Sequence, residues 1–308
     1  MSERDAVFHG SSGYLSPSPR PVVTIGNFDG VHRGHQALVA RVVERARQSG
    51  CPSCVYTFDP SPVEVLSPDR RGPRIQTMAE RVELLLRLGI DHVVIEKFDL
   101  AFAAHDADWF AREVLTRRLG ASAVVVGADF RFGRGRQGTV QELPRLLAVD
   151  VEPFGQVCAD DTPVSSSRVR ALVASGSVEM AAKLLGRPHR VVGQVVHGDG
   201  RGRKIGFPTA NLLPETELLP ALGVYAAKVW IEGVPRPAVV NLGVRPTFGR
   251  GGVSLEAHLL GWSGEIYGHR VSVDFVARIR SEEKFPTVDA LIERIGVDAS
   301  LAAELLQG

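Results

Sequence analysis

The sequence predicts two domains: an α/β domain with a mostly parallel sheet, followed by a compact antiparallel β-barrel with a terminal helix. The first observation is size, because 308 residues with 44% hydrophobic residues suffice for two hydrophobic cores. The second is that strand-like and helix-like segments alternate only up to about residue 186. The third is that later strands follow one another without helices between them. We therefore expect domains at 1–186 and 187–308.

The first domain is expected to be doubly wound. Short apolar runs rich in β-branched residues predict strands at 22–25, 55–58, 92–95 and 123–126. Apolar residues at helical spacing predict helices at 35–48, 78–88 and 107–119. Ligands of such domains bind beyond the carboxyl ends of the strands.

The second domain follows a helical stretch at 178–185 and a short polar joint at 186–190. Apolar runs separated by glycine and proline predict strands at 191–196, 224–231, 238–242, 254–260 and 271–277. Many strands joined by such turns favour an antiparallel barrel, and a closing helix over 288–306 is expected to pack against it.

Composition narrows the function classes. The net charge of +1 argues against nucleic acid or an anionic membrane as a partner. No apolar run approaches the roughly 18 residues of a membrane-spanning helix, and the polar segment 1–21 does not resemble a signal peptide, so we expect a cytoplasmic protein.

The three cysteines are too few for a disulfide framework. Cys51 and Cys54 have the spacing of a redox or zinc half-site, but no second ligand pair follows them. We interpret them as two thiols near the start of a strand.

The strongest local motif is the segment 26–35, which stands between the first strand and the first helix. A glycine-rich turn that feeds a helix directs backbone N–H groups at a bound phosphate. Gly34 permits close approach of a phosphate, and the flanking His32 and His35 can donate hydrogen bonds to charge that develops on phosphorus. The motif predicts nucleotidyl transfer, and the alternative is two surface histidines in a tight turn.

A second motif stands at an expected helix start. Ser166 and Ser167 can donate hydrogen bonds there, and Arg168 offers a planar cation to phosphate oxygens. Taken alone, the segment could be a plain helix cap. Its combination with the His32 and His35 turn favours a phosphate-binding role.

A third motif, residues 198–211, combines glycines, cations and oxygen ligands. The glycines at 198, 200, 202 and 206 allow the backbone to approach phosphates, and Arg203 and Lys204 add positive charge. Thr209 and Asn211 provide hard oxygens of the kind that Mg²⁺ accepts. No Walker-type phosphate loop is present, so a kinase here would have a different design.

Taken together, these motifs resemble the bacterial riboflavin kinase/FAD synthetase family, whose first domain carries the HxGH signature of nucleotidylyltransferases. The N-terminal matches are segments 26–35, 58–62, 126–133 and 165–170. The C-terminal matches are segments 208–211, 223–226, 241–248, 255–258, 266–268 and 280–285. The resemblance spans roughly residues 22–295, nearly the whole chain.

The resemblance implies a Rossmann-like nucleotidylyltransferase domain that converts FMN to FAD, followed by a barrel that phosphorylates riboflavin to FMN. In the first domain it implies a catalytic role for His32 and His35. It also implies binding of nucleotide and phosphate by other residues of the motifs: Gly26, Phe28, Asp29, Gly34, Asp129, Ser166, Ser167 and Arg168. In the barrel it implies nucleotide contacts from Arg203, Lys204, Gly206 and Pro208.

The resemblance also assigns the chemistry of the barrel. Thr209 and Asn211 would hold Mg²⁺ and ATP phosphates, and Glu256 would accept the proton of the riboflavin 5′-hydroxyl. By strand alternation alone, Glu256 is either an ordinary solvent-facing residue or an inward-facing functional one. The implied ligands are riboflavin, FMN, FAD, ATP and Mg²⁺, with neither nucleic acid nor membrane, and the expected state is a monomer or a weak homo-oligomer.

Three alternatives remain open. Ser61 and Ser167 replace the histidine and threonine usual in the family, so the kinase alone could be active. A flavin- or nucleotide-binding regulator without turnover is a second alternative, which the full set of catalytic residue types disfavours. Adenylyl transfer to another acceptor, or an aminoacyl-tRNA synthetase fragment, is a third, and the near-zero net charge disfavours tRNA.

Overall fold

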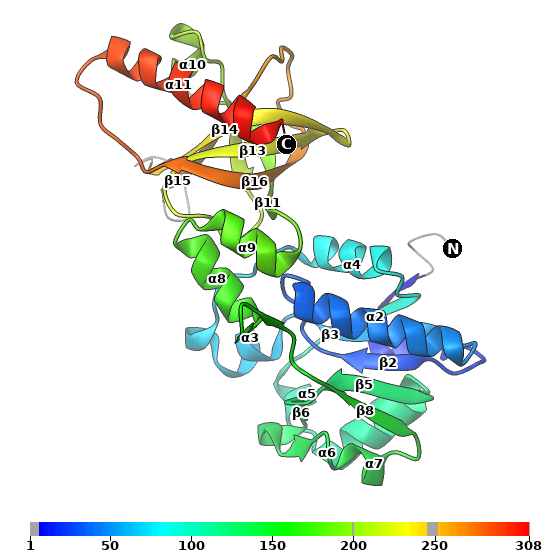
Figure 1. Cartoon of the computed structure of the whole chain (residues 1–308). Helices are drawn as coiled ribbons and strands as arrows, with labels where there is room; N and C mark the ends of the chain where they lie inside the picture. Colours follow the sequence, from blue (N-terminus) through cyan, green and yellow to red (C-terminus); the bar gives the residue numbers. More distant parts are fainter. Residues whose placement is uncertain (1–5, 199, 245–251, 308) are drawn as a thin grey trace. The chain divides into compact units, whose positions relative to one another are not determined.

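The computed structural model describes residues 6–198, 200–244 and 252–307, which form two compact units (Figure 1). The first unit comprises Met1–Gly72 and Met78–Ser165, and the second comprises Pro73–Thr77 and Ser166–Gly308. The boundary between the two expected activities, at residues 186 and 187, stays a prediction. Among the described residues, no helix has the length and apolar character needed to span a membrane.

The first unit contains a six-stranded sheet in which every pair of neighbours is parallel. In spatial order the strands are β1 (Val7–His9), β4 (His92–Glu96), β3 (Ser53–Phe58), β2 (Val22–Ile25), β5 (Ala123–Gly127) and β8 (Asp150–Phe154). The chain winds from β2 outward to β4 and then returns to the other side of β2 with β5. The predicted doubly wound fold is confirmed, and its topological switch point lies between β2 and β5.

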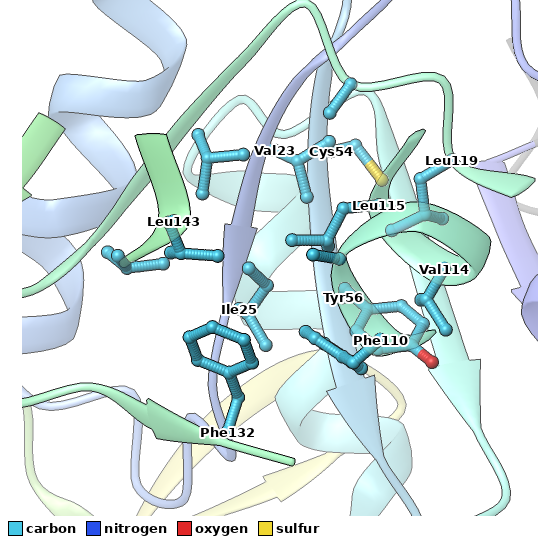
Figure 2. Packing of buried hydrophobic residues seen from close by; sticks show 14 of the residues in the cluster. Val23, Ile25, Cys54, Tyr56, Phe110, Val114, Leu115, Leu119, Phe132 and Leu143 are labelled. Atoms are coloured by element: carbon cyan, nitrogen blue, oxygen red, sulfur yellow. The ribbon is translucent and has the colours of Figure 1, made fainter. Parts of the chain in front are cut away.

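Alternate residues along each strand have their side chains on opposite faces of this sheet. Val23 and Ile25 of β2 pack with Tyr56 of β3 and Phe110 on one face, which Figure 2 shows from close by. Val22 belongs to a separate cluster on the opposite face. A period of two along each strand is expected for a sheet covered on both faces.

The helices of the first unit vary in length. They are α2 (Arg33–Gln48), α3 (Pro62–Leu66), α4 (Met78–Arg87), α5 (Leu100–Ala103), α6 (Ala107–Trp109), η3 (Phe110–Arg118) and α7 (Leu143–Leu146). Single turns η1 (Ser11–Gly13), η2 (Pro68–Arg70) and η4 (Arg134–Arg136) and short pairs β6 (Arg131–Phe132) with β7 (Gly138–Thr139) and β9 (Cys158–Ala159) with β10 (Thr162–Pro163) complete it. The helix expected at 107–119 is α6 followed by η3, a π-helix.

The second unit contains a closed antiparallel barrel. Around the barrel the strands are β11 (His189–Val196), β12 (Ala210–Pro214), β15 (Val253–Leu259), β14 (Val234–Val244), β13 (Gly223–Ile231) and β16 (Arg270–Arg280). The predicted barrel is confirmed, although strand β12 was not expected. It pairs with β11 and β15 and so closes the ring.

Among its described residues, the second unit also contains the helices α8 (Ser166–Ala174), α9 (Val178–Leu185), α10 (Arg201–Lys204) and α11 (Val288–Leu306). The closing helix α11 has the bounds expected from the sequence. Its residues Ala302 and Leu306 pack on Val224 and Ala226 of β13 and on Val239 of β14, outside the barrel interior (Figure 1).

Candidate active sites

The turn after β2 lies at the switch point of the parallel sheet. Its backbone is tied to β3, because the Gly26 N–H donates to the Tyr56 carbonyl at 3.1 Å. Phe28 and Val31 both have positive φ angles, of 50° and 38°, and both side chains are buried. Side chains in such conformations persist only where the surrounding packing holds them, so the turn is fixed before any ligand binds.

The two histidines of this turn are stacked at the start of α2. His32 is the N-cap residue, and its Nδ1 accepts a hydrogen bond from the His35 backbone N–H at 3.3 Å. The ring centroids are 3.7 Å apart and nearly parallel. A Cβ on Gly34 would lie 3.2 Å from the His32 ring. A side chain here would crowd the stacked ring, so glycine suits this arrangement as well as the predicted approach of a phosphate.

His35 is held in its neutral form. Burial lowers its pKa well below the usual 6.5, and the neighbouring His32 and Arg81 lower it further. Its Nδ1 atom is buried and has no hydrogen-bond partner among the described residues. A neutral imidazole can donate one ring N–H to a ligand oxygen without carrying a charge of its own.

A buried ion pair stands beside the histidines. The Arg81 guanidinium of α4 lies 3.5 Å from the Asp29 carboxylate, and both residues are buried. The sequence predicted Asp29 as part of the site but not Arg81. The helical stretch at 78–88 carries four charged residues, so its pattern does not single out Arg81.

The remaining predicted residues of the first site lie on separate elements. Asp129 is exposed in the loop after β5, one of the two strands that flank the switch point. Ser166, Ser167 and Arg168 form the first turn of α8, in the second unit. That these three residues act together with the histidine turn stays a prediction.

In the barrel, strand register brings three polar residues together. Glu256 on β15 is paired with Asn211 on β12 and with Asn241 on β14. Directly paired residues of neighbouring strands share one face of a sheet. The Thr209 hydroxyl donates to Oε2 of Glu256 at 3.4 Å. Asn241 was not predicted as a site residue, although a polar residue within an apolar strand pointed to it.

Glu256 is directed away from the barrel interior. Its neighbours Leu255 and Ala257 are buried in the barrel core, so Glu256 lies on the outer face of β15. It is nevertheless partly buried, because it lines a cavity under other elements. Glu256 was expected to be either an ordinary solvent-facing residue or an inward-facing functional one, and neither description fits fully. Its side chain faces away from the barrel interior, yet it lines a cavity and does not lie on an open surface.

Asn211 is packed against the glycine-rich segment. A Cβ on Gly198 would lie 2.2 Å from the Asn211 side-chain nitrogen, and one on Gly202 would lie 2.3 Å from the Phe207 carbonyl oxygen. The Asn211 Oδ1 atom is buried and has no hydrogen-bond partner among the described residues. A buried amide oxygen without a partner is well suited to bind a hard cation.

Two cavities meet at Thr209. The larger, of about 390 Å³, contains Thr209, Asn241 and Glu256. Its apolar walls are Ile205, Phe207, Val224, Val239, Phe285, Leu291 and Ile295. The smaller, of about 280 Å³, is lined by Thr209 together with the predicted residues Arg203 and Pro208, and by Trp262 and Tyr267.

Parts of the predicted third motif lie outside the described structure. Gly206 has a φ of 88°, which favours glycine, and it stands in the turn between α10 and β12. The side chain of Lys204 is outside the described part of the chain, as are Asp199 and residues 245–248 of the expected family motif.

Comparison with known proteins gives matches over both units. A family model for FAD synthetase matches residues 16–168, and one for riboflavin kinase matches residues 185–306. The bifunctional riboflavin kinase/FMN adenylyltransferase of Escherichia coli (strain K12) is 38% identical over 94% of this chain and 95% of its own. Its counterpart from Pseudomonas fluorescens is 39% identical over 92% of each chain.

A more distant relative and a solved structure match over a similar extent. The Bacillus subtilis (strain 168) protein of the same description is 34% identical over 91% of this chain and 90% of its own. A crystal structure described as a macrolide-efflux protein from Streptococcus pneumoniae has a TM-score of 0.88 at 31% identity, over 96% of this chain and 98% of that chain. The fold is therefore shared along nearly the whole chain.

Proposed function

Because the chain belongs to the bifunctional riboflavin kinase/FMN adenylyltransferase family, we propose that it makes FMN from riboflavin and ATP, and then FAD from FMN and a second ATP. The kinase reaction is assigned to the barrel and the adenylyl transfer to the parallel-sheet unit. The observation that carries the kinase assignment is the meeting of two cavities at Thr209, beside Glu256.

The larger cavity suits the acceptor of the phosphoryl group. Its mostly apolar walls match the flat ring of riboflavin, and Glu256 is placed to accept the proton of the 5′-hydroxyl. The smaller cavity, with Arg203 and Trp262, suits ATP. Positioning of the two substrates on either side of Thr209 is the main contribution that phosphoryl transfer requires of a protein.

We assign a Mg²⁺ site to Thr209 and Asn211. The Oδ1 of Asn211, which has no partner among the described residues, and the hydroxyl of Thr209 are hard oxygen donors next to the glycine-rich segment. When bound, the ion would neutralise charge on the transferred phosphoryl group.

In the adenylyl transfer, a phosphate oxygen of FMN attacks the α-phosphorus of ATP. The new P–O bond forms as the bond from the α-phosphorus to the bridging oxygen breaks, and pyrophosphate leaves. We assign the hydrogen bonds to the developing charge to His32 and neutral His35. Binding of the pyrophosphate by Ser166, Ser167 and Arg168 stays a prediction from the sequence. No protein nucleophile takes part.

A chain in which only the kinase works is the alternative, prompted by Ser61 and Ser167. Ser61 stands at the N-cap position of α3, and its backbone N–H donates to the Glu64 carboxylate at 2.7 Å. Serine is a preferred residue at that position, so Ser61 has a local structural role in this chain. The bifunctional relatives favour two activities over one.

Incubation of the purified chain with riboflavin, ATP and Mg²⁺, followed by chromatography of the flavins, tests this proposal. FMN should appear first and FAD later. FMN without FAD, even when FMN is supplied directly, would leave the kinase alone. No turnover of either flavin would favour the binding regulator. The cytoplasmic location and the lack of nucleic-acid partners stay predictions.

A further inference from the structure

Arg280 and Asp298 form a buried ion pair between the barrel and its closing helix. The Asp298 side chain is 2% exposed and that of Arg280 is 10% exposed. The guanidinium donates to Asp298 through Nε at 2.9 Å, and its Nη2 lies 2.8 Å from the same oxygen. Arg280 ends β16 and Asp298 stands in the middle of α11, so the pair fixes the helix to the strand.

Arg280 also fixes the segment that joins these two elements. Its Nη1 donates to the Ser281 carbonyl at 3.0 Å. Its guanidinium lies over the Phe285 ring, 5.5 Å from the ring centroid. A planar guanidinium can bind a carboxylate and pack on an aromatic ring at once, which a lysine ammonium cannot do in the same way.

The groups that Arg280 fixes form one wall of the larger cavity. Leu291, Ile295 and Asp298 lie at helical spacing on one face of α11 and line that cavity together with Phe285 and with Arg280 itself. Glu256 lines the same cavity from β15. The position of this wall relative to Glu256 therefore depends on the Arg280 contacts.

We propose that Arg280 is a positioning residue for the phosphoryl acceptor: through Asp298 and Phe285 it holds the α11 wall against the flat ring of the substrate. This inference rests on the proposed kinase function of the barrel. The wall residues, Arg280, Phe285, Leu291, Ile295 and Asp298, do not line the smaller cavity, so binding of ATP should not depend on them.

The test measures steady-state kinetics of FMN formation in three variants. Arg280→Lys keeps the positive charge but loses the planar guanidinium. Phe285→Leu removes the aromatic ring and leaves the ion pair between Arg280 and Asp298 intact. Arg270→Lys is the matched control, because Arg270 makes an exposed ion pair with Glu215 at the other end of β16. FAD formation from FMN, which is assigned to the first unit, serves as an internal control for the amount of active protein, and a thermal melt checks that the barrel is folded.

In the first two variants, KM for riboflavin should rise about threefold to tenfold, the size expected for one weakened aromatic contact. KM for ATP, the rate of FAD formation and all constants of Arg270→Lys should stay at wild-type values. If the Arg280→Lys variant does not fold, KM for riboflavin in the Phe285→Leu variant tests the positioning role alone.

Two results would overturn the positioning role. One is an unchanged KM for riboflavin in a variant that only melts at a lower temperature. The other is an equal rise in KM for ATP. A wild-type chain that makes no FMN would instead overturn the kinase assignment, and the two failures are thereby distinguishable.

Discussion

At the scale of single residues, the two turns that we propose to bind phosphate contain glycines at positions where an added Cβ would crowd a neighbouring side chain. Gly34 leaves room for the His32 ring, and Gly198 leaves room for the Asn211 amide. In both turns the glycine is close to a residue proposed to act on phosphate or metal. At these two positions glycine leaves room for the side chain of His32 or Asn211, in addition to allowing a ligand to approach the backbone.

Gly198→Ala should therefore impair the kinase. The new methyl group would overlap the Asn211 side chain, so Asn211 must leave its position. Overpacking of this kind costs about 1–3 kcal/mol, and a misplaced metal ligand should raise KM for ATP by about tenfold. Kinetics of FMN formation and a thermal melt measure both effects.

Gly296→Ala is the control for this substitution, because no atom lies within 4 Å of the added methyl group. It should leave KM for ATP unchanged. Equal KM values for ATP in the Gly198→Ala and wild-type chains would contradict the role given to Asn211.

Thr209 and Asn211 could be proposed as ligands from the sequence because their oxygens stand in a short, dense motif, and that role stays a prediction. Asn241 and Arg81 escaped prediction because each meets its site through contacts distant in sequence. Asn241 reaches Glu256 only through the register of β14 with β15, and Arg81 reaches Asp29 from α4. Such pairings are set by the fold and not by local spacing.

At the scale of elements, strands with plain apolar patterns were predictable and strands with mixed composition were not. Strand β12 carries Asn211 and ends on Pro214, inside a segment dominated by its motif. Strand β8 contains Asp150 and Glu152, whose carboxylates pair with arginines of α2. In β12 the residues of the motif interrupt the apolar pattern that indicates a strand. In β8 the ion-paired carboxylates interrupt it.

The π-helix η3 also could not be predicted. Its buried residues Phe110, Val114 and Leu115, with Leu119 after it, recur every four to five residues. This spacing is close enough to the α-helical period that the sequence indicates only a helix. The i to i+5 hydrogen bonds of a π-helix become visible only in the structure, as in the bond from Leu119 N–H to the Val114 carbonyl.

Strand β11 contains a buried histidine that should make the barrel sensitive to acid. His189 is 1% exposed, its Nε2 lies 3.0 Å from the Leu218 carbonyl, and burial lowers its pKa to about 4. The unfolded chain binds this proton below about pH 6.5, whereas the native chain binds it only near pH 4. The free energy of unfolding should therefore decrease as the pH is lowered through this range, by about 2 kcal/mol between pH 7 and pH 5.

Urea unfolding of His189→Gln and the parent chain at pH 7 and pH 5 measures this contribution. A Trp109→Phe background leaves only Trp230 and Trp262, both in the second unit, as fluorescent reporters. The glutamine variant should lose less stability than its parent on acidification. Identical losses in the two chains would contradict the prediction.

At the scale of the whole molecule, each unit has its own hydrophobic core. The change from alternating helices and strands to consecutive strands was enough to predict both folds. Pattern alone could not show that α8, which carries Ser166 and Arg168, groups by contacts with the barrel. Contacts between segments distant in sequence decide to which unit α8 belongs. The sequence of this nine-residue helix does not show which segments it contacts.

The central claim is that two reactions are carried out at two sites with separate residues. The most direct measurement compares FMN formation from riboflavin and FAD formation from FMN in the Glu256→Gln variant. Loss of the proton acceptor should slow FMN formation by about 10²- to 10⁴-fold and leave FAD formation unchanged. Loss of both activities together, or FMN formation at the wild-type rate, would contradict the account.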